Sequence, residues 1–220
     1  QVQPLFGNYI FQDEKNSNKF RLHFYQGGIG LPDRDYYFDK DERTVTIRNE
    51  YVKHISKMFQ LTGIDAATAD TYAQTIMKME TDFAGASRKL ADLRDPYANY
   101  NSMAVADVNK LCPAINWESF LADAGIKNID TIIVGQPEFF KQLNTSLTKE
   151  SVDNWKIYLQ WNLINAYADR LSSDFDKEHF HFYGTILNGT KEQRARWKRV
   201  LDAEEDAMGF LLGQLYVEAY

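Results

Sequence analysis

The chain has 220 residues and a formal net charge of −6 at pH 7, and hydrophobic residues make up 44% of it. This length suits one large domain or one and a half small ones. The apolar share predicts a packed core rather than disorder, and the acidic balance does not favour nucleic acid as a partner. No apolar run is long enough to span a membrane.

The ends of the chain and its single cysteine give weaker indications. The first residues include neither an initiating Met nor the charged and apolar regions of a signal peptide, and the last residues stop inside a helical pattern. We therefore expect a piece of a longer protein. Cys112 is the one cysteine, so no disulfide forms within the chain.

The chain begins with a predicted β-hairpin. Two aromatic-rich stretches within about residues 5–26 flank a polar turn, which is typical of paired strands. The next segment, GGIGLPDRDYY at 27–37, lacks the third glycine of a nucleotide-binding fingerprint. Asp33 and Asp35 would favour a helix start and repel a phosphate. The segment therefore predicts a tight turn followed by a helix.

The rest of the chain is predicted to be mostly helical. Apolar residues at helical spacing indicate helices at about 41–61, 65–92, 137–147, 152–171, 173–188 and 191–219. Asp65 is the expected N-cap of the second helix, and Thr190 with Gln193 forms a capping-box pattern before the last. TIIVG at 131–135 is a possible short strand. The expected fold is mainly α: a multi-helical lobe with a small β-hairpin near the N-terminus.

Glu80 is the most conspicuous charged residue, because it lies on the apolar stripe of its helix. A buried carboxylate needs a partner or a proton. We interpret it as a structural anchor, with Arg34, Arg88 and Arg94 as possible partners, while a catalytic role stays open.

The residues do not predict a metal site or a nucleophile. The chain contains no H-E-x-x-H pattern, and its four histidines are His23, His54, His179 and His181. His179 and His181 are two residues apart, which places them on different faces of a helix. Cys112 has no nearby histidine, and no G-x-S-x-G occurs.

Six segments resemble, in order, motifs of the neprilysin and endothelin-converting-enzyme family of zinc endopeptidases, together covering nearly the whole chain. The segments are GGIGLPDRDYY, MKMETDFAGAS (77–87), LRDPYANYNSM (93–103), INWESFL (115–121), YLQWNLINAYADRLSSDF (158–175) and the final stretch from 195 to 220. Val200 stands where animal members have a disulfide cysteine, which suggests a bacterial relative.

The resemblance implies a cap lobe, because the family has two mainly helical lobes around a large cavity. Its zinc site, an H-E-x-x-H helix with a downstream Glu, lies beyond the region represented here. The family's substrate motif lies beyond it too, and the Asn165-Ala166-Tyr167 triplet falls within a long helix and is not that motif. No catalytic or metal-binding residue is therefore carried over to this chain, and its substrate-binding residues stay unassigned. The structural candidates are Asp33, Arg34, Asp35, Glu80, Arg94 and Asp95.

The parent protein is then expected to use zinc and to cleave peptides on the amino side of hydrophobic residues. The expected partners of this lobe are the catalytic lobe of the same protein and peptides in the shared cavity. An extracytoplasmic location, periplasmic or lipid-anchored, is expected from the family. Two alternatives stay open: a non-catalytic helical binding module derived from the same family, and a stand-alone hydrolase that uses Glu80 with a neighbouring acid.

Overall fold

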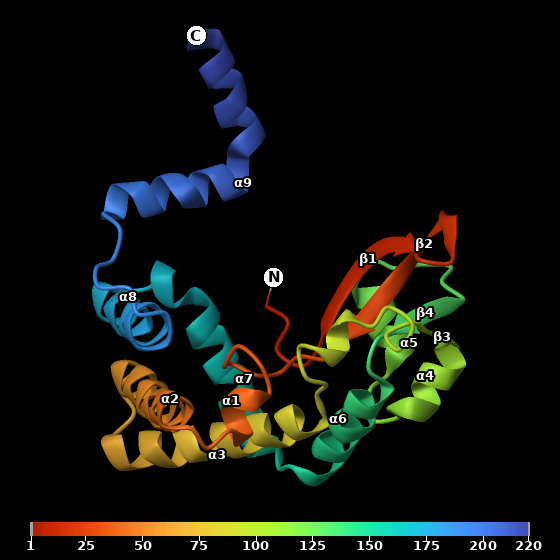
Figure 1. The fold of residues 1–220 in the computed structure, drawn as a ribbon, viewed down its shortest axis with the longest axis horizontal. Helices are drawn as coiled ribbons and strands as arrows, with labels where there is room; N and C mark the ends of the chain where they lie inside the picture. Colours follow the sequence, from red (N-terminus) through yellow and green to blue (C-terminus); the bar gives the residue numbers. More distant parts are fainter. Residues whose placement is uncertain (1, 220) are drawn as a thin grey trace. The chain divides into compact units, whose positions relative to one another are not determined.

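The computed structural model describes residues 2–219. The chain divides into two compact units, Gln1–His179 and Phe180–Tyr220, and Figure 1 shows its elements in order. The first unit contains a four-stranded sheet and most of the helices, and the second is helical. The fold is mainly α with a small sheet and an N-terminal hairpin, which confirms the fold class expected from the sequence.

The sheet has the strand order β1-β2-β4-β3. β1 (Gly7–Asp13) and β2 (Asn16–Tyr25) form the antiparallel hairpin, and β2 then pairs in parallel with β4 (Thr131–Val134). β3 (Asn101–Ala104) pairs antiparallel with β4 at the far edge. The sequence patterns indicated the hairpin and β4 but not β3, which lies at the end of a loop-like polar stretch.

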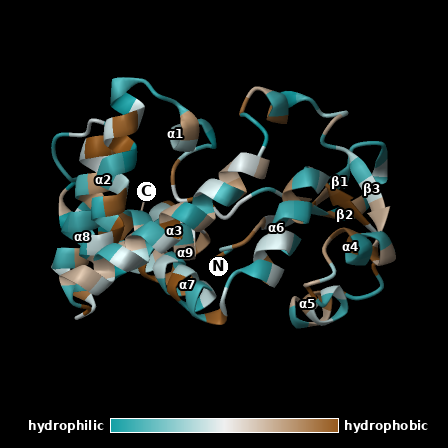
Figure 2. Ribbon diagram, turned by 90° about the horizontal axis from the view of Figure 1, so that it is seen from below, coloured by the Kyte–Doolittle hydropathy of each residue, from teal (hydrophilic) through white to brown (hydrophobic). Residues whose placement is uncertain are grey.

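One face of the sheet forms the main core. Because side chains alternate along a strand, Leu22 and Phe24 of β2 share this face, opposite Ile132 and Val134 of β4. Figure 2 shows the hydrophobic colouring of β2. The ring of Phe24 lies 5.1 Å from that of Trp117. Three helices pack on this side: α4 (Val105–Leu111), α5 (Trp117–Asp123) and α6 (Pro137–Lys149).

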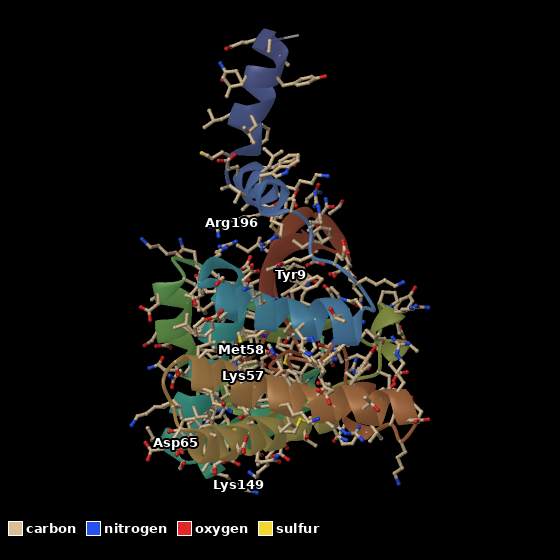
Figure 3. All side chains as sticks on the ribbon, turned by 90° about the vertical axis from the view of Figure 1, so that its left-hand side faces the viewer. Tyr9, Lys57, Met58, Asp65, Lys149 and Arg196 are labelled. Carbon is tan, nitrogen blue, oxygen red and sulfur yellow. The ribbon has the colours of Figure 1, made fainter. Side chains whose placement is uncertain are left out.

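The other helices of the first unit form a second packed layer around α3. They are α1 (Asp35–Phe38), α2 (Glu42–Leu61), α3 (Ala66–Ala86), α7 (Val152–Tyr167) and α8 (Ser173–His179), with short 3₁₀ turns η1 (Asp92–Arg94) and η2 (Ala168–Arg170). Asp65 caps α3 by accepting a hydrogen bond from the Thr68 amide at 3.0 Å. On α2, Lys57 is exposed while its neighbour Met58 is fully buried (Figure 3).

The second unit contains the π-helix Phe180–Leu187 (η3) and α9 (Arg196–Ala219). Within α9, Met208 has φ −139° and ψ 28°, which marks a kink. Many large apolar side chains of α9 are exposed, and Phe210 is 100% exposed. Among the described residues, no helix is both long and apolar enough to cross a membrane.

The structure corrects several predicted helix bounds. The helix expected at 65–92 ends at Ala86, because Ser87 is extended and the Arg88 amide donates to the side chain of Gln26, just after β2. The helix expected at 152–171 ends at Tyr167 and continues as a 3₁₀ turn. The helix expected at 173–188 is α-helical only to His179 and then becomes a π-helix.

The last helix also begins later than expected, at Arg196 rather than Lys191. The capping box proposed for Thr190 and Gln193 is therefore wrong. The Thr190 amide instead donates to the carbonyl of Gly184 at 2.9 Å, so it closes the preceding π-helix.

Candidate functional site

Glu80 lies at the centre of a buried polar cluster. Its side chain is 1% exposed and accepts hydrogen bonds from Tyr37, at 2.7 Å to Oε2, and from Tyr51, at 3.0 Å to Oε1. Burial raises the pKa of Glu80 to about 7, although the hydrogen bonds from Tyr37 and other donors act in the opposite direction. The carboxyl group is therefore near its titration midpoint at neutral pH.

The glycine segment closes over this cluster. The Tyr37 hydroxyl accepts hydrogen bonds from the amides of Gly30, at 3.2 Å, and Leu31, at 3.1 Å. A Cβ atom on Gly30 would lie 1.9 Å from the Tyr51 hydroxyl. Gly28 has φ +71°, a conformation that suits glycine. The glycines thus allow a close backbone approach to Glu80, and this explains their spacing without a phosphate.

Arg34 is not the partner of Glu80. Its Nε donates to the carbonyl of Ala84 at 3.1 Å, and its guanidinium lies 5.3 Å from the centre of the Phe38 ring. The acids on either side of it organise the helix start: Asp33 accepts from the Asp35 amide at 2.7 Å, and Asp35 lies 3.6 Å from the Lys89 ammonium. The hydrogen-bond donors to Glu80 are therefore tyrosine hydroxyls, and not the arginines that the sequence suggested.

Arg94 is the last residue of η1, and Asp95 follows it at the start of the next loop. The Asp95 carboxylate accepts hydrogen bonds from the amides of Tyr97, at 2.9 Å, and Ala98, at 3.1 Å, so it shapes the turn. The Arg94 amide donates to the carbonyl of Ala91 at 3.3 Å. Neither residue belongs to the Glu80 cluster.

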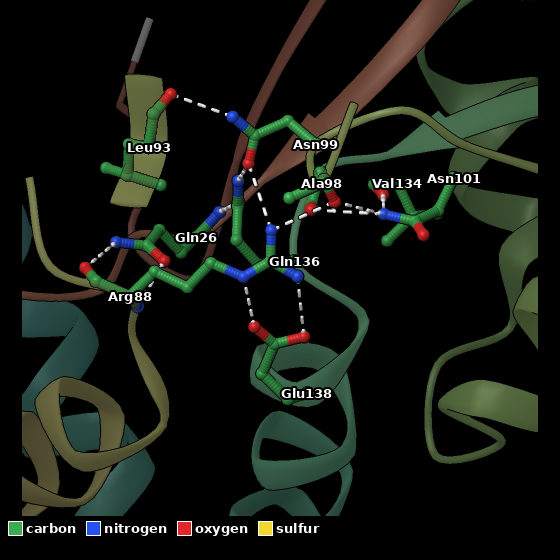
Figure 4. Close-up of polar contacts among 10 residues, drawn as sticks. Gln26, Arg88, Leu93, Ala98, Asn99, Asn101, Val134, Gln136 and Glu138 are labelled. Atoms are coloured by element: carbon green, nitrogen blue, oxygen red, sulfur yellow. Dashed lines mark hydrogen bonds and ion pairs between the residues drawn. The ribbon is translucent and has the colours of Figure 1, made fainter. Parts of the chain in front are cut away.

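A polar network attaches this loop to the sheet and to α6 (Figure 4). Gln26 and Arg88 exchange two hydrogen bonds, at 3.0 and 2.8 Å, and Arg88 forms an ion pair with Glu138. The Asn99 Oδ1 accepts from Arg88 at 3.1 Å and from Gln136 at 3.0 Å, while its Nδ2 donates to the carbonyl of Leu93 at 2.7 Å. We call the side chains of this network the amide lock: Gln26, Arg88, Asn99, Gln136 and Glu138.

A pocket of about 440 Å³ lies between the amide lock and the sheet face opposite the main core. Its apolar lining includes Tyr9, Tyr25, Ile29, Leu90 and Leu93, and its polar lining includes Glu14, His23, Asp33 and the lock residues Gln26, Arg88, Asn99 and Gln136. This combination of an apolar wall with a few fixed polar groups is typical of ligand pockets.

His23 is the most deeply buried titratable group of the pocket, at 4% exposure. Its ring stacks on Tyr9 with centroids 4.9 Å apart, and its Nδ1 lies 3.7 Å from the Glu14 carboxylate. Burial lowers the pKa of His23, which favours the neutral ring, although the charges of Glu14 and Asp13 act in the opposite direction. Its Nε2 has no hydrogen-bond partner among residues 2–219.

The His, Cys, Asp and Glu side chains of residues 2–219 do not form a zinc centre. In the described part of the chain, no group of three or more His, Cys, Asp or Glu side chains is placed to hold a metal ion. His54 Nδ1 lies 2.9 Å from Glu178, which joins α2 to α8. Cys112 is buried, which raises its pKa to about 11 and makes it a poor thiolate ligand.

Sequence reasoning missed the tyrosine partners of Glu80 and the pocket. Tyr37 belongs to the glycine segment, but no local pattern reports that a hydroxyl reaches a carboxylate 43 residues away. One feature of the sequence could have indicated the pocket. Side chains alternate along β1 and β2, and this places Tyr9, His23 and Tyr25 on one face of the sheet.

Comparison with known proteins identifies the family. The profile of Peptidase family M13 matches residues 1–220. Endothelin-converting enzyme 1 from Cavia porcellus is 30% identical over 224 residues, covering 100% of this chain and 30% of its own length. Neprilysin from Mus musculus is 28% identical over 234 residues, covering 98% of this chain and 31% of its own.

Solved structures agree with this result. The crystal structure of the Mycobacterium tuberculosis zinc metalloprotease ZMP1 with an inhibitor has a TM-score of 0.90 and 32% identity, and covers 99% of this chain and 33% of its own. PEPO from Lactobacillus rhamnosis, at 14% identity and a TM-score of 0.70 over 87% of this chain and 30% of its own, shares the fold. The chain thus spans about a third of the length of these proteins. It belongs to Peptidase family M13.

Proposed function

We propose that this chain is part of the cap lobe of a zinc-dependent endopeptidase. The observation that supports it most is that the family match runs over the whole chain while the chain covers only about 30% of its relatives. The catalytic lobe of the same polypeptide would then supply the zinc and the reacting groups. This chain would limit which substrates reach them.

The exposed apolar side chains of α9 support a partner within the same protein. Phe210, Tyr216 and Val217 are 100%, 66% and 76% exposed. An apolar surface of this kind usually marks an interaction site. We assign it to contact with the remainder of the parent polypeptide.

The proposed chemistry in the parent is peptide-bond hydrolysis on the amino side of hydrophobic residues. A zinc ion, when bound by the other lobe, lowers the pKa of a water molecule and polarises the peptide carbonyl. The residues described here would act by excluding large substrates and admitting flexible peptides. A location outside the cytoplasm belongs to the same proposal and is tested by cell fractionation.

The direct test compares two substrates of the full-length parent protein. One is a short peptide with a hydrophobic residue, and the other is the same sequence inserted in a surface loop of a large folded carrier. We expect the peptide to be cut before its hydrophobic residue, as mass spectrometry of the products would show, and the carrier to be spared. Chelation should stop the cleavage. Equal cleavage of both substrates would contradict the cap role.

The alternative is a non-catalytic binding module that kept this lobe. The coding sequence beyond Tyr220 separates the two. An H-E-x-x-H motif there supports the peptidase, and a stop codon supports the module.

A further inference from the structure

The pocket beside the amide lock has a charge pattern that the proposed function does not use. Three charged side chains line it: Glu14, Asp33 and Arg88. The charge of Arg88 is matched by its ion pair with Glu138. Among residues 2–219, Asp33 forms no ion pair, and the carboxylate of Glu14 pairs with no Lys or Arg and lies 3.7 Å from the His23 ring. The pocket therefore presents two carboxylates that pair with no Lys or Arg among residues 2–219, one of which, Asp33, also accepts a hydrogen bond from the Asp35 amide.

The amide groups of the lining are already used. Gln136 Oε1 accepts from the Gln26 amide at 2.9 Å, and Asn99 Oδ1 accepts from both Arg88 and Gln136. These groups make a rigid wall with little capacity left for a ligand. The available interactions are the two carboxylates, the aromatic rings and the apolar side chains.

The remaining lining suits a cation on an aliphatic stem. Tyr9 is 47% exposed and Tyr25 is 40% exposed, so their rings are accessible to a ligand. A cation over an aromatic face is stabilised by the ring electrons. Leu90 and Leu93 offer apolar surface for methylene groups, as long cationic side chains require. His23 belongs to the same lining, and its buried Nε2 has no hydrogen-bond partner among residues 2–219.

We propose that this pocket binds the arginine or lysine side chain of an extended peptide, with Glu14 and Asp33 as the counter-charges. The inference rests on the proposed function, because a lobe that admits peptide substrates meets such side chains. The pocket would then favour substrates with a cationic residue away from the cleaved bond. Its size, about 440 Å³, accommodates one side chain rather than a helix.

The test uses the full-length parent protein and a pair of fluorescent peptides. The two peptides differ at one position, arginine in one and its neutral isostere citrulline in the other. We expect anisotropy titrations to give an affinity about tenfold higher for the arginine peptide. Glu14→Gln and Asp33→Asn should each reduce this preference, and the double variant should abolish it. Glu118→Gln, at an exposed carboxylate outside the pocket, should leave it unchanged.

Several outcomes would overturn the inference. Equal affinity for the two peptides, or a preference that survives the double variant with its melting temperature unchanged, would exclude the pocket as a cation site. Failure of both peptides to bind would mean that another part of the parent chain covers the pocket, so the pocket would not be a peptide-binding site. Mass spectrometry of the same samples reports cleavage separately. Cleavage without discrimination contradicts only this inference, and discrimination without cleavage contradicts only the proposed peptidase.

Discussion

The Tyr37 hydroxyl donates a hydrogen bond to the Glu80 carboxylate at 2.7 Å and accepts two from the backbone of the glycine segment. One hydroxyl thereby joins α1, α3 and the turn that follows the hairpin. This relationship explains why a glycine-rich segment, a following tyrosine and a buried glutamate occur together in the sequence. It also supports the interpretation of Glu80 as a structural anchor.

Replacing Tyr37 by Phe should therefore destabilise the chain. The change leaves a buried carboxylate and two backbone amides with fewer partners, which costs about 1–3 kcal/mol for an unsatisfied buried group. Urea unfolding measures the loss. Tyr36→Phe is the matched control, since its hydroxyl forms no hydrogen bond within residues 2–219, and it should change stability by less than about 0.5 kcal/mol. Equal effects of the two variants would contradict the anchor.

The stability of the chain should also depend on the ionisation of Glu80. Burial raises its pKa from 4.5 to about 7 in the folded state, so the folded chain binds more protons than the unfolded chain between these values. The contribution of Glu80 is thus most favourable below about pH 4.5 and is lost as pH rises through about 7. The shift corresponds to roughly 3 kcal/mol.

Unfolding free energies of the wild type and Glu80→Gln at pH 5, 6, 7 and 8 test this dependence. The amide cannot ionise, so the wild type should lose stability relative to the variant as pH increases. Other titrating groups cancel in the difference. A difference that is constant with pH would show that Glu80 has the same ionisation in both states.

Two glycine-to-alanine changes should have opposite signs. Gly30→Ala would place a Cβ atom 1.9 Å from the Tyr51 hydroxyl, and forced overpacking costs about 1–3 kcal/mol. Gly85→Ala lies inside α3, where the new atom would be 3.8 Å from Phe38, and should stabilise the helix by up to about 1 kcal/mol. Thermal melts of the two variants check the prediction. A neutral Gly30→Ala would mean that the turn does not approach the Glu80 cluster this closely.

The amide lock should control the mobility of the loop at 89–98. Asn99→Ala removes the acceptor for Arg88 and Gln136 and the donor to Leu93, so the loop loses its attachment. We expect limited proteolysis within this loop to become several times faster. Asn18→Ala, at an exposed hairpin position, should leave the cleavage rate unchanged. The lock is refuted if both variants are cut at the wild-type rate.

The sequence predicted elements better than it predicted contacts. Apolar periodicity indicated α2 closely, and Asp65 as the N-cap of α3 follows from local chemistry. The end of α3 was missed because Gln26, far away in sequence, bonds to the backbone of Arg88. The start of α9 was misplaced because a local capping pattern gave way to the bond between Thr190 and Gly184.

The pocket could not be predicted from the sequence, because it too depends on contacts between residues far apart in the chain. Its lining comes from the hairpin, the glycine segment, the loop after α3 and the start of α6. Only the fold brings these together. By contrast, the family could be inferred from sequence, because six motifs in a fixed order are informative without any contact.

The most direct test of the central claim measures zinc and peptide hydrolysis in two proteins, the full-length parent and the chain of residues 1–220. We predict that the parent binds zinc and cleaves a peptide in a chelator-sensitive way, whereas the 220-residue chain does neither. Chelator-sensitive hydrolysis by the 220-residue chain alone, or a parent that neither binds zinc nor cleaves peptides, would contradict the account.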